Sequence, residues 1–278
     1  MTAQKQERIA KVIARSGLCS RREAEKLIAE GRVQLDGRTL DTPAVVVAPG
    51  ARIRVDGKSL PRAEHTRLFC YHKPRGRVTS TTDRDGRPTV YDDFPAGLPR
   101  LLPVGRLDIA SEGLLLLTND GELKRFLELP ANALERRYRV RAYGEVREDR
   151  LAELARGVTV EGQRYGPIEA TLERRSGTNA WLLMSLHEGK NREIRKVCEH
   201  LGLRVNRLQR LSYGPFELGA LPPGAVWEVP AELLASRLDY RLATRSRTGF
   251  AKAKAPPGKR RSGRPERSGT HAHRRRAP

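Results

Sequence analysis

Four consecutive leucines, Leu114 to Leu117, constrain the fold of this chain more than any other feature of its sequence. A short apolar run that is bounded by turn-forming residues is typical of a buried β-strand. The residues before it, Gly105-Arg106-Leu107-Asp108, are interpreted as a loop, and Thr118-Asn119-Asp120-Gly121 after it as a turn and helix cap. We therefore expect the strand to lie in a sheet that is covered by other parts of the chain.

Residues 67–240 mix short apolar runs with helical stretches. The apolar runs predict strands at 68–71, 114–117, 138–140, 168–172 and 181–186, and helical patterns predict helices at 121–129, 147–155 and 192–201. Strands outnumber helices, and their connections vary in length. This pattern indicates an α+β domain around a largely antiparallel mixed sheet that is flanked by helices.

Residues 6–60 predict a second, smaller unit of helices and strands. Ser20 followed by Glu23 is a capping box that starts a helix. Two Asp-Gly pairs, at 36–37 and 56–57, predict hairpin turns. Solvated helix faces usually mix charges of both signs, whereas cations crowd here, which favours a phosphate-binding face. These cations are Lys11, Arg15, Arg21, Arg22, Lys26 and Arg32.

The net charge of +21 predicts a polyanionic partner, because Lys and Arg side chains release counterions when they contact phosphates. A membrane surface would attract the same charge, but no apolar run approaches the roughly 20 residues that span a bilayer, so we expect no membrane partner. Residues 241–278 hold 13 Lys and Arg and one acid, Glu266, with few large apolar residues. We expect this segment to be a disordered basic tail, either an RNA-binding arm or a nonspecific solubilising tail.

Asp108 is the candidate for chemistry. An Asp in a loop is usually only a turn or capping residue. Here the residue follows Arg106 by two positions and precedes a strongly apolar strand, and distant Arg-rich segments could supply a partner. These features favour a functional carboxylate.

The segment GRLDIASEGLLLLTNDG (105–121) resembles the catalytic motif of the bacterial ribosomal pseudouridine synthases, in the group of small-subunit synthase A and large-subunit synthases B, E and F. Three further segments resemble motifs of this family in the same order: HKPRGRVTS (72–80), RRYRV (136–140) and EGKNREIRKVCEHLGLRVNRLQRLSYGPFELGAL (188–221). The run SRREAEKLIAEGRVQLDGR (20–38) resembles an S4-type RNA-binding domain. The resemblance covers about residues 6–235 and is strongest to the synthases of type B.

The resemblance implies an S4-type domain at 6–64, a pseudouridine synthase domain at 67–240 and the tail at 241–278. It implies that a uridine of large-subunit ribosomal RNA is flipped out and isomerised. The reaction needs no redox step or phosphate transfer, so we expect no cofactor and no metal. We also expect a cytoplasmic monomer.

The resemblance also assigns roles to single residues. Asp108 matches the catalytic carboxylate, Arg195 the guanidinium that favours its charged form, and Tyr138 the aromatic ring that packs against the flipped uracil. Arg106 matches the side chain that inserts near the vacated position. We expect three further cations to contact phosphates of the RNA or to support the site: Lys73, Lys190 and Arg210. RNA contacts are also expected from Arg192, and in the S4-type domain from Ser20, Arg21, Arg22, Lys26 and Arg32.

Several alternatives stay open at this point. Asp108 could attack the sugar, attack the base or remove the ribose 2′ hydrogen. The spacing of Arg192, Arg195 and Lys196 would also suit a solvated helix face. The target could be a small-subunit uridine, or the chain could be a noncatalytic S4-type binder that acts in ribosome assembly.

Overall fold

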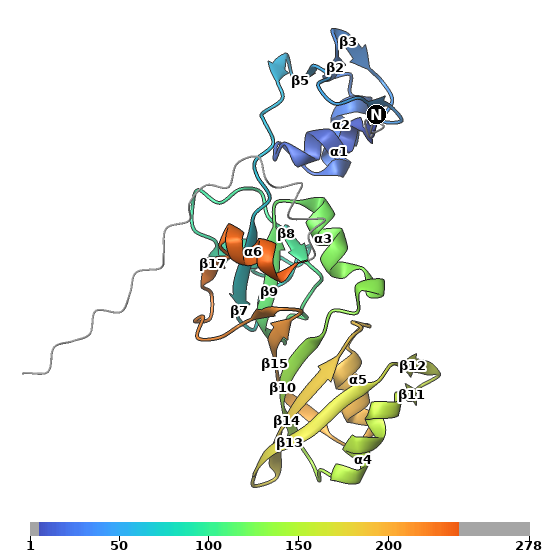
Figure 1. The fold of residues 1–278 in the computed structure, drawn as a ribbon, viewed down its shortest axis with the longest axis vertical. Helices are drawn as coiled ribbons and strands as arrows, with labels where there is room; N and C mark the ends of the chain where they lie inside the picture. The colour runs from blue at the N-terminus through green and yellow to red at the C-terminus, as the bar shows by residue number, and fades with distance from the viewer. Residues whose placement is uncertain (1–5, 239–278) are drawn as a thin grey trace, which may run out of the picture.

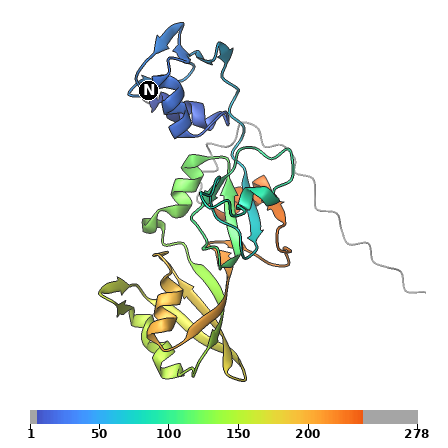
Figure 2. The same cartoon turned by 180° about the vertical axis from the view of Figure 1, so that it is seen from behind.

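The computed structural model describes residues 6–238, which form two domains (Figure 1). The N-terminal domain comprises residues 7–59 and the C-terminal domain residues 68–237, and the linker between them, residues 60–67, contains no helix or strand. The N-terminal domain lies at one end of an elongated molecule, as the view from behind also shows (Figure 2). The tail predicted at 241–278 lies outside the described residues.

The N-terminal domain packs two helices, α1 (Ile9–Arg15) and α2 (Arg21–Ala29), against a four-stranded sheet. The capping box at Ser20 is present and starts α2 as predicted. Both predicted Asp-Gly turns are present and close the hairpins β2–β3 and β5–β6. The sheet has the order β3 (Arg38–Leu40), β2 (Val33–Leu35), β5 (Ile53–Val55), β6 (Lys58–Ser59), and a separate pair joins β1 (Glu7–Arg8) to β4 (Val46–Val47).

A nine-stranded sheet forms the C-terminal domain. Within it β15 runs parallel to β9, and the other strand pairs of this sheet are antiparallel, which confirms the predicted largely antiparallel sheet. Its main path is β13 (Ile168–Ser176), β14 (Asn179–Leu186), β10 (Arg136–Tyr143), β15 (Arg204–Tyr213), β9 (Glu112–Thr118), β7 (Leu68–Lys73) and β17 (Val226–Glu228). Two short strands extend it: β8 (Leu102–Val104) pairs with β9, and β16 (Phe216–Glu217) with β15.

Helices cover this sheet and complete its core. The bounds are α3 (Gly121–Glu128), α4 (Glu148–Glu153), α5 (Glu193–His200) and α6 (Ala231–Arg237), and a small hairpin joins β11 (Val158–Val160) to β12 (Gln163–Tyr165). Short 3-10 turns lie at Val90–Asp93, Pro130–Asn132 and Leu154–Arg156.

Strand β9 is buried along its whole length, as its leucines predicted. Successive strand residues point to opposite faces of a sheet. Leu115 and Leu117 accordingly join the larger core with α5, whereas Leu114 and Leu116 join a second core under α3 and α6. The strand therefore lies between two hydrophobic cores, and packing against both of its faces holds it in place.

Candidate active site

The loop at residues 105–111 carries Asp108 and joins β8 to β9. Within it the Ser111 N–H donates to the Asp108 carbonyl at 2.9 Å. From outside, the Thr79 hydroxyl donates to the Leu107 carbonyl at 2.8 Å and accepts from the Leu107 N–H at 3.3 Å. The backbone around Asp108 is thus fixed by side chains as well as by its own turn.

Lys73 is a charged anchor beneath this loop. It is fully buried, and its ammonium donates to the carbonyl oxygens of Pro74, Asp108 and Ser111 at 3.2, 3.0 and 2.8 Å. Burial lowers the pKa of Lys73 to about 8, against the opposing charges of Asp108 and Glu112. Of the two expected roles, phosphate contact or support of the site, this geometry favours support, because the ammonium is enclosed and bound to the backbone. The residue ends β7, whose six residues are all buried.

A cavity of about 590 Å³ opens beside the loop. This volume lies within the roughly 300–1,000 Å³ that is usual for small-ligand pockets. Asp108 and Tyr138 both line it, although 30 residues separate them in the sequence. Its lining comes from the loop, from β10 and β15 and from the turn before α5: Gly105, Arg106, Leu107, Asp108, Ser111, Glu128, Pro130, Arg136, Tyr138, Leu186, His187, Glu188, Gly189, Lys190, Arg192, Glu193, Ile194, Leu208, Arg210 and Tyr213.

Gly113 brings the two sides of this site together. Tyr138 on β10 is in register with Arg210 on β15, and Arg210 is in register with Gly113 on β9. Gly113 has φ +104°, and a Cβ there would lie 2.3 Å from the Arg210 carbonyl oxygen. A residue without a side chain is therefore required where β9 and β15 approach each other.

Arg210 lies in the wall of the cavity and is almost fully buried. Only 2% of the residue is exposed, and its Nε donates to the Leu114 carbonyl at 2.7 Å. Its guanidinium lies 5.1 Å from the centre of the Tyr213 ring. Its Nη2 is buried and has no hydrogen-bond partner among the described residues. Arg210 was expected to contact phosphates or to support the site, and its burial favours support of the cavity wall.

Arg195 reaches the catalytic loop from α5. Its Nη2 lies 3.2 Å from the Ala110 carbonyl and 3.5 Å from the Ser111 hydroxyl. Burial and the neighbouring charge of Arg192 lower the pKa of Arg195, whereas the Asp108 charge acts in the opposite direction. No ion pair within 4.0 Å joins Arg195 to Asp108 in the described part of the chain. Arg195 therefore holds the loop next to Asp108, and its charge acts on the carboxylate from a longer distance.

Two carboxyl groups lie in the opposite wall. Glu193 is the first residue of α5 and is 4% exposed, and its Oε2 accepts from the Lys190 N–H at 2.9 Å. Burial, with a contribution from the neighbouring Glu188 carboxylate, raises the pKa of Glu193 to about 7. Glu188 accepts from the Gly166 N–H at 2.7 Å and pairs with the Lys190 ammonium at 2.7 Å. These contacts fix the turn that faces Asp108.

Three of the predicted RNA-binding cations line the cavity and are exposed: Arg106, Lys190 and Arg192. Arg192 has φ +52°, a left-handed conformation that is uncommon for a residue with a side chain. The positions of Arg106 and Arg192 suit contacts with phosphates, whereas the Lys190 ammonium is engaged by Glu188 and the Arg164 carbonyl. The RNA contacts of all three stay predictions.

In the N-terminal domain, Arg21, Arg22 and Lys26 are exposed on α2. Arg21 and Arg22 have no hydrogen bond or ion pair among residues 6–238, and Lys26 lies 3.7 Å from a Glu30 carboxylate oxygen. All three side chains are therefore accessible to a polyanion.

The other two residues predicted for this surface are already engaged. The Ser20 hydroxyl accepts from the Glu23 N–H at 3.1 Å, so it caps α2. Arg32 donates to both carboxylate oxygens of Asp56, at 2.7 and 2.8 Å, and to Glu30 at 3.0 Å. Its charge is compensated within the domain, which weakens the prediction that it meets RNA.

Sequence reasoning missed Arg136, which is 9% exposed and lies in the cavity wall. Its guanidinium donates to the carbonyls of His187 and Leu134 at 2.9 and 3.1 Å and to the Tyr213 hydroxyl at 2.8 Å. It thereby joins the turn before α5 to β10. Its position two residues before Tyr138 could have indicated that both side chains point to the same face of the strand.

Among the described residues, no group of three or more His, Cys, Asp or Glu side chains could hold a metal ion. No helix between residues 6 and 238 is long and apolar enough to cross a membrane.

Comparisons with known proteins agree with this site and fold. The family model of RNA pseudouridylate synthases matches residues 67–200, and the S4 domain model matches residues 7–53. An RNA pseudouridine synthase of Rickettsia felis is 44% identical over 228 residues, which cover 82% of this chain and 99% of the relative. Ribosomal large subunit pseudouridine synthase B of Salmonella typhi is 40% identical over 227 residues, 80% of this chain and 78% of that protein.

A solved structure supports the same assignment. A crystal structure of pseudouridylate synthase has a TM-score of 0.58 and 27% sequence identity, and the match covers 83% of this chain and 99% of that chain. The chain therefore belongs to the RNA pseudouridine synthase family, whose members are isomerases that convert uridine in RNA to pseudouridine. An N-terminal S4 domain precedes its catalytic domain, and RNA is its substrate.

Proposed function

We propose that this enzyme isomerises a uridine of large-subunit ribosomal RNA, with Asp108 as the catalytic carboxylate. The observation that carries the proposal is one cavity in which a tethered loop presents Asp108 across from Tyr138. The similarity to the Salmonella large-subunit synthase supports the choice of RNA. We also propose that the enzyme acts as a monomer in the cytoplasm, where ribosomal RNA is available.

The proposed reaction breaks the bond between uracil N1 and ribose C1′ and forms a bond between uracil C5 and the same C1′. The C5 hydrogen leaves as a proton and N1 gains one, so the product is an isomer of the substrate. One ionised carboxylate is enough for each route: attack on the sugar, attack on the base or removal of the 2′ hydrogen.

The proposed roles follow from position. Tyr138 supports the flipped uracil by stacking, which contributes about 1–3 kcal/mol per base. Arg195 keeps the loop in place through its hydrogen bond to the Ala110 carbonyl, and so positions Asp108. Exposed Arg106, at the cavity mouth, fills the position that the flipped nucleotide leaves.

Replacing Asp108 with Asn tests the catalytic assignment. RNA labelled with tritium at uracil C5 releases tritium to water only when C5 is rejoined to the sugar. We expect Asp108→Asn to abolish tritium release and to leave RNA affinity within a few fold of wild type. Turnover at the wild-type rate would show that Asp108 is not the catalytic group.

The choice of ribosomal subunit needs its own measurement. Pseudouridines should be mapped in ribosomal RNA from cells with and without the gene. We expect one large-subunit pseudouridine to disappear without the gene. Loss of a small-subunit pseudouridine instead would replace the proposed target and leave the reaction unchanged.

A further inference from the structure

A second hollow lies between the two domains, and we call it the interdomain cleft. Its volume is about 820 Å³. It is lined from α1 and α2 on one side and from α3 and its neighbours on the other, by Lys11, Ala14, Arg15, Ser20, Arg21, Arg100, Leu102, Asn119, Asp120, Gly121, Glu122, Lys124, Arg125, Phe126, Glu128 and Leu129. None of the catalytic residues proposed above lies in it.

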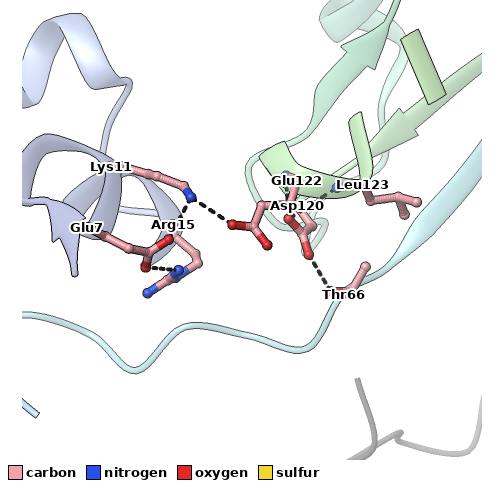
Figure 3. A network of polar contacts seen from close by, with 7 residues as sticks. All are labelled: Glu7, Lys11, Arg15, Thr66, Asp120, Glu122 and Leu123. Atoms are coloured by element: carbon pink, nitrogen blue, oxygen red, sulfur yellow. Dashed lines mark hydrogen bonds and ion pairs between the residues drawn. The ribbon is translucent and has the colours of Figure 1, made fainter. Parts of the chain in front are cut away.

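Polar contacts join the N-terminal domain and the linker to the start of α3, beside this cleft (Figure 3). Lys11 of α1 donates to Glu122 of α3 at 2.7 Å and to Glu7 at 2.6 Å. On the linker side, the Thr66 hydroxyl donates to Asp120 at 2.6 Å. These contacts hold α1 beside the N-terminus of α3, so the cleft is a formed space.

The charge of the interdomain cleft is positive, and part of it is uncompensated. Six cationic side chains line it against three carboxylates. The carboxylates are engaged, since Asp120 caps α3, Glu122 pairs with Lys11, and Glu128 accepts from the backbone. Three guanidiniums, by contrast, form no hydrogen bond and no ion pair within 4.0 Å among residues 6–238: Arg21, Arg100 and Arg125.

The interdomain cleft borders the catalytic cavity. Glu128, the last residue of α3, lines both the cleft and the catalytic cavity. Its Oε1 accepts from the N–H of Gly105, the first residue of the catalytic loop, at 2.6 Å. A bound polymer that runs along α3 from the cleft therefore reaches the catalytic loop, which carries Asp108. Leu129, which is 42% exposed, and half-buried Phe126 add apolar surface along the way.

We propose that the interdomain cleft binds the sugar–phosphate backbone of the RNA that flanks the target uridine, with Arg21, Arg100 and Arg125 facing its phosphates. Guanidinium groups suit phosphate oxygens because they donate in a planar fork. The cleft then connects the RNA-binding face of α2 to the catalytic cavity. This inference rests on the proposed function only for the identity of the RNA.

The test uses the full chain and an in vitro transcript of bacterial large-subunit ribosomal RNA. Replacing Arg100 and Arg125 together with Gln removes two free charges from the C-terminal domain's side of the cleft. We expect Kd to rise about tenfold or more at 100 mM salt. The slope of log affinity against log salt should fall by about two, because each phosphate contact contributes about one. The loss of kcat/KM should appear mainly in KM.

The matched control replaces Arg38 and Arg141 with Gln. Both are exposed arginines outside the interdomain cleft, one in each domain, without a hydrogen bond or ion pair among the described residues. The control removes the same formal charge as the Arg100/Arg125 variant. Because both of its arginines lie outside the cleft, we expect its Kd to stay within twofold of wild type. Equal losses in both variants would show that only total charge matters, and wild-type binding by the Arg100/Arg125 variant would also overturn the proposal.

A charge-keeping variant separates binding from folding. Replacing Arg100 and Arg125 with Lys should restore most of the affinity if phosphates are bound, and a defect that persists in it would point to lost structure. Failure of the proposed function would look different, because wild-type protein would bind this RNA but release no tritium from it. Failure of the cleft proposal would leave both turnover and the affinity of the Gln variant normal.

Discussion

Lys73 has no exposed surface, and its three acceptors are backbone carbonyls, two of them in the catalytic loop. A buried ammonium is tolerated only when its hydrogen bonds are satisfied. Here those bonds replace the contacts that water would make, and they fix the loop backbone at the Asp108 and Ser111 carbonyls. The residue acts on the site through the loop without touching the cavity.

Replacing Lys73 with Met should separate this role from RNA binding. Met keeps the unbranched apolar stem of the side chain but leaves the carbonyls without their donor, so we expect a loss of about 2–3 kcal/mol in the free energy of unfolding. Turnover should fall at least tenfold. The salt dependence of RNA binding should not change, whereas a phosphate contact at Lys73 would lower its slope by about one. Urea unfolding and binding titrations at several salt concentrations measure these outcomes.

Glu193 predicts a dependence of stability on pH. Its pKa rises from 4.5 to about 7 in the folded protein, mainly through burial. Folding therefore takes up a proton between these values, so the contribution is complete below pH 4.5 and is lost as pH rises through 7. Between pH 5 and pH 8 we expect the free energy of unfolding to fall by about 1–3 kcal/mol more in the wild type than in Glu193→Gln.

Urea unfolding at both pH values checks this prediction. Glu199→Gln is the matched control, because Glu199 is exposed on the same helix. The control should keep the wild-type pH response. If Glu193→Gln also kept the wild-type pH response, a group other than Glu193 would cause the dependence of stability on pH.

Among the elements, β9 connects structure to function most directly. Its two faces belong to different cores, its first half contacts β15, and its N-terminal end leads into the catalytic loop. The parallel contact with β15 is possible only because Gly113 has no side chain. That contact sets how far the Asp108 loop lies from Tyr138.

Replacing Gly113 with Ala should therefore disrupt the centre of the sheet. We expect a loss of more than about 3 kcal/mol, from overpacking and an unfavourable φ together, or no soluble protein. Gly57→Ala isolates the cost of the unfavourable φ, because Gly57 has φ +74° but an added Cβ there would have nothing within 4 Å. That control should lose about 1 kcal/mol in urea unfolding. Similar losses in both variants would contradict the steric explanation.

At the scale of the whole molecule, the two domains are joined by a short linker and a few polar contacts. The Lys11–Glu122 ion pair is half-buried, with 25% and 27% of the side chains exposed. Such pairs contribute modestly, about 0.2–1 kcal/mol. The hydrophobic cores of the two domains are separate, so we expect this pair to help hold the domains together.

Lys11→Met should loosen this junction. We expect proteolytic cleavage within residues 61–66 to become about two- to fivefold faster, while urea unfolding changes by less than about 0.5 kcal/mol. Lys58→Met is the control, because Lys58 is exposed on β6 and its side chain forms no hydrogen bond or ion pair with the described residues of the C-terminal domain. An unchanged cleavage rate in Lys11→Met would show that the ion pair does not hold the domains together.

The sequence by itself determined the local features and the family. The capping box at Ser20, the Asp-Gly hairpins and the buried strand at Leu114–Leu117 depend on neighbouring residues, so their patterns were readable without a fold. The motif around Asp108 was equally readable, because it is contiguous.

Only the tertiary structure decided which charged residues face RNA and which support the site. Lys73 and Arg210 resemble surface cations in the sequence, but strands from distant segments enclose both. The parallel placement of β15 beside β9 and the interdomain cleft were equally hidden. Burial and pairing depend on which segments meet in space, and a charged residue carries no mark in its sequence neighbourhood of what will cover it.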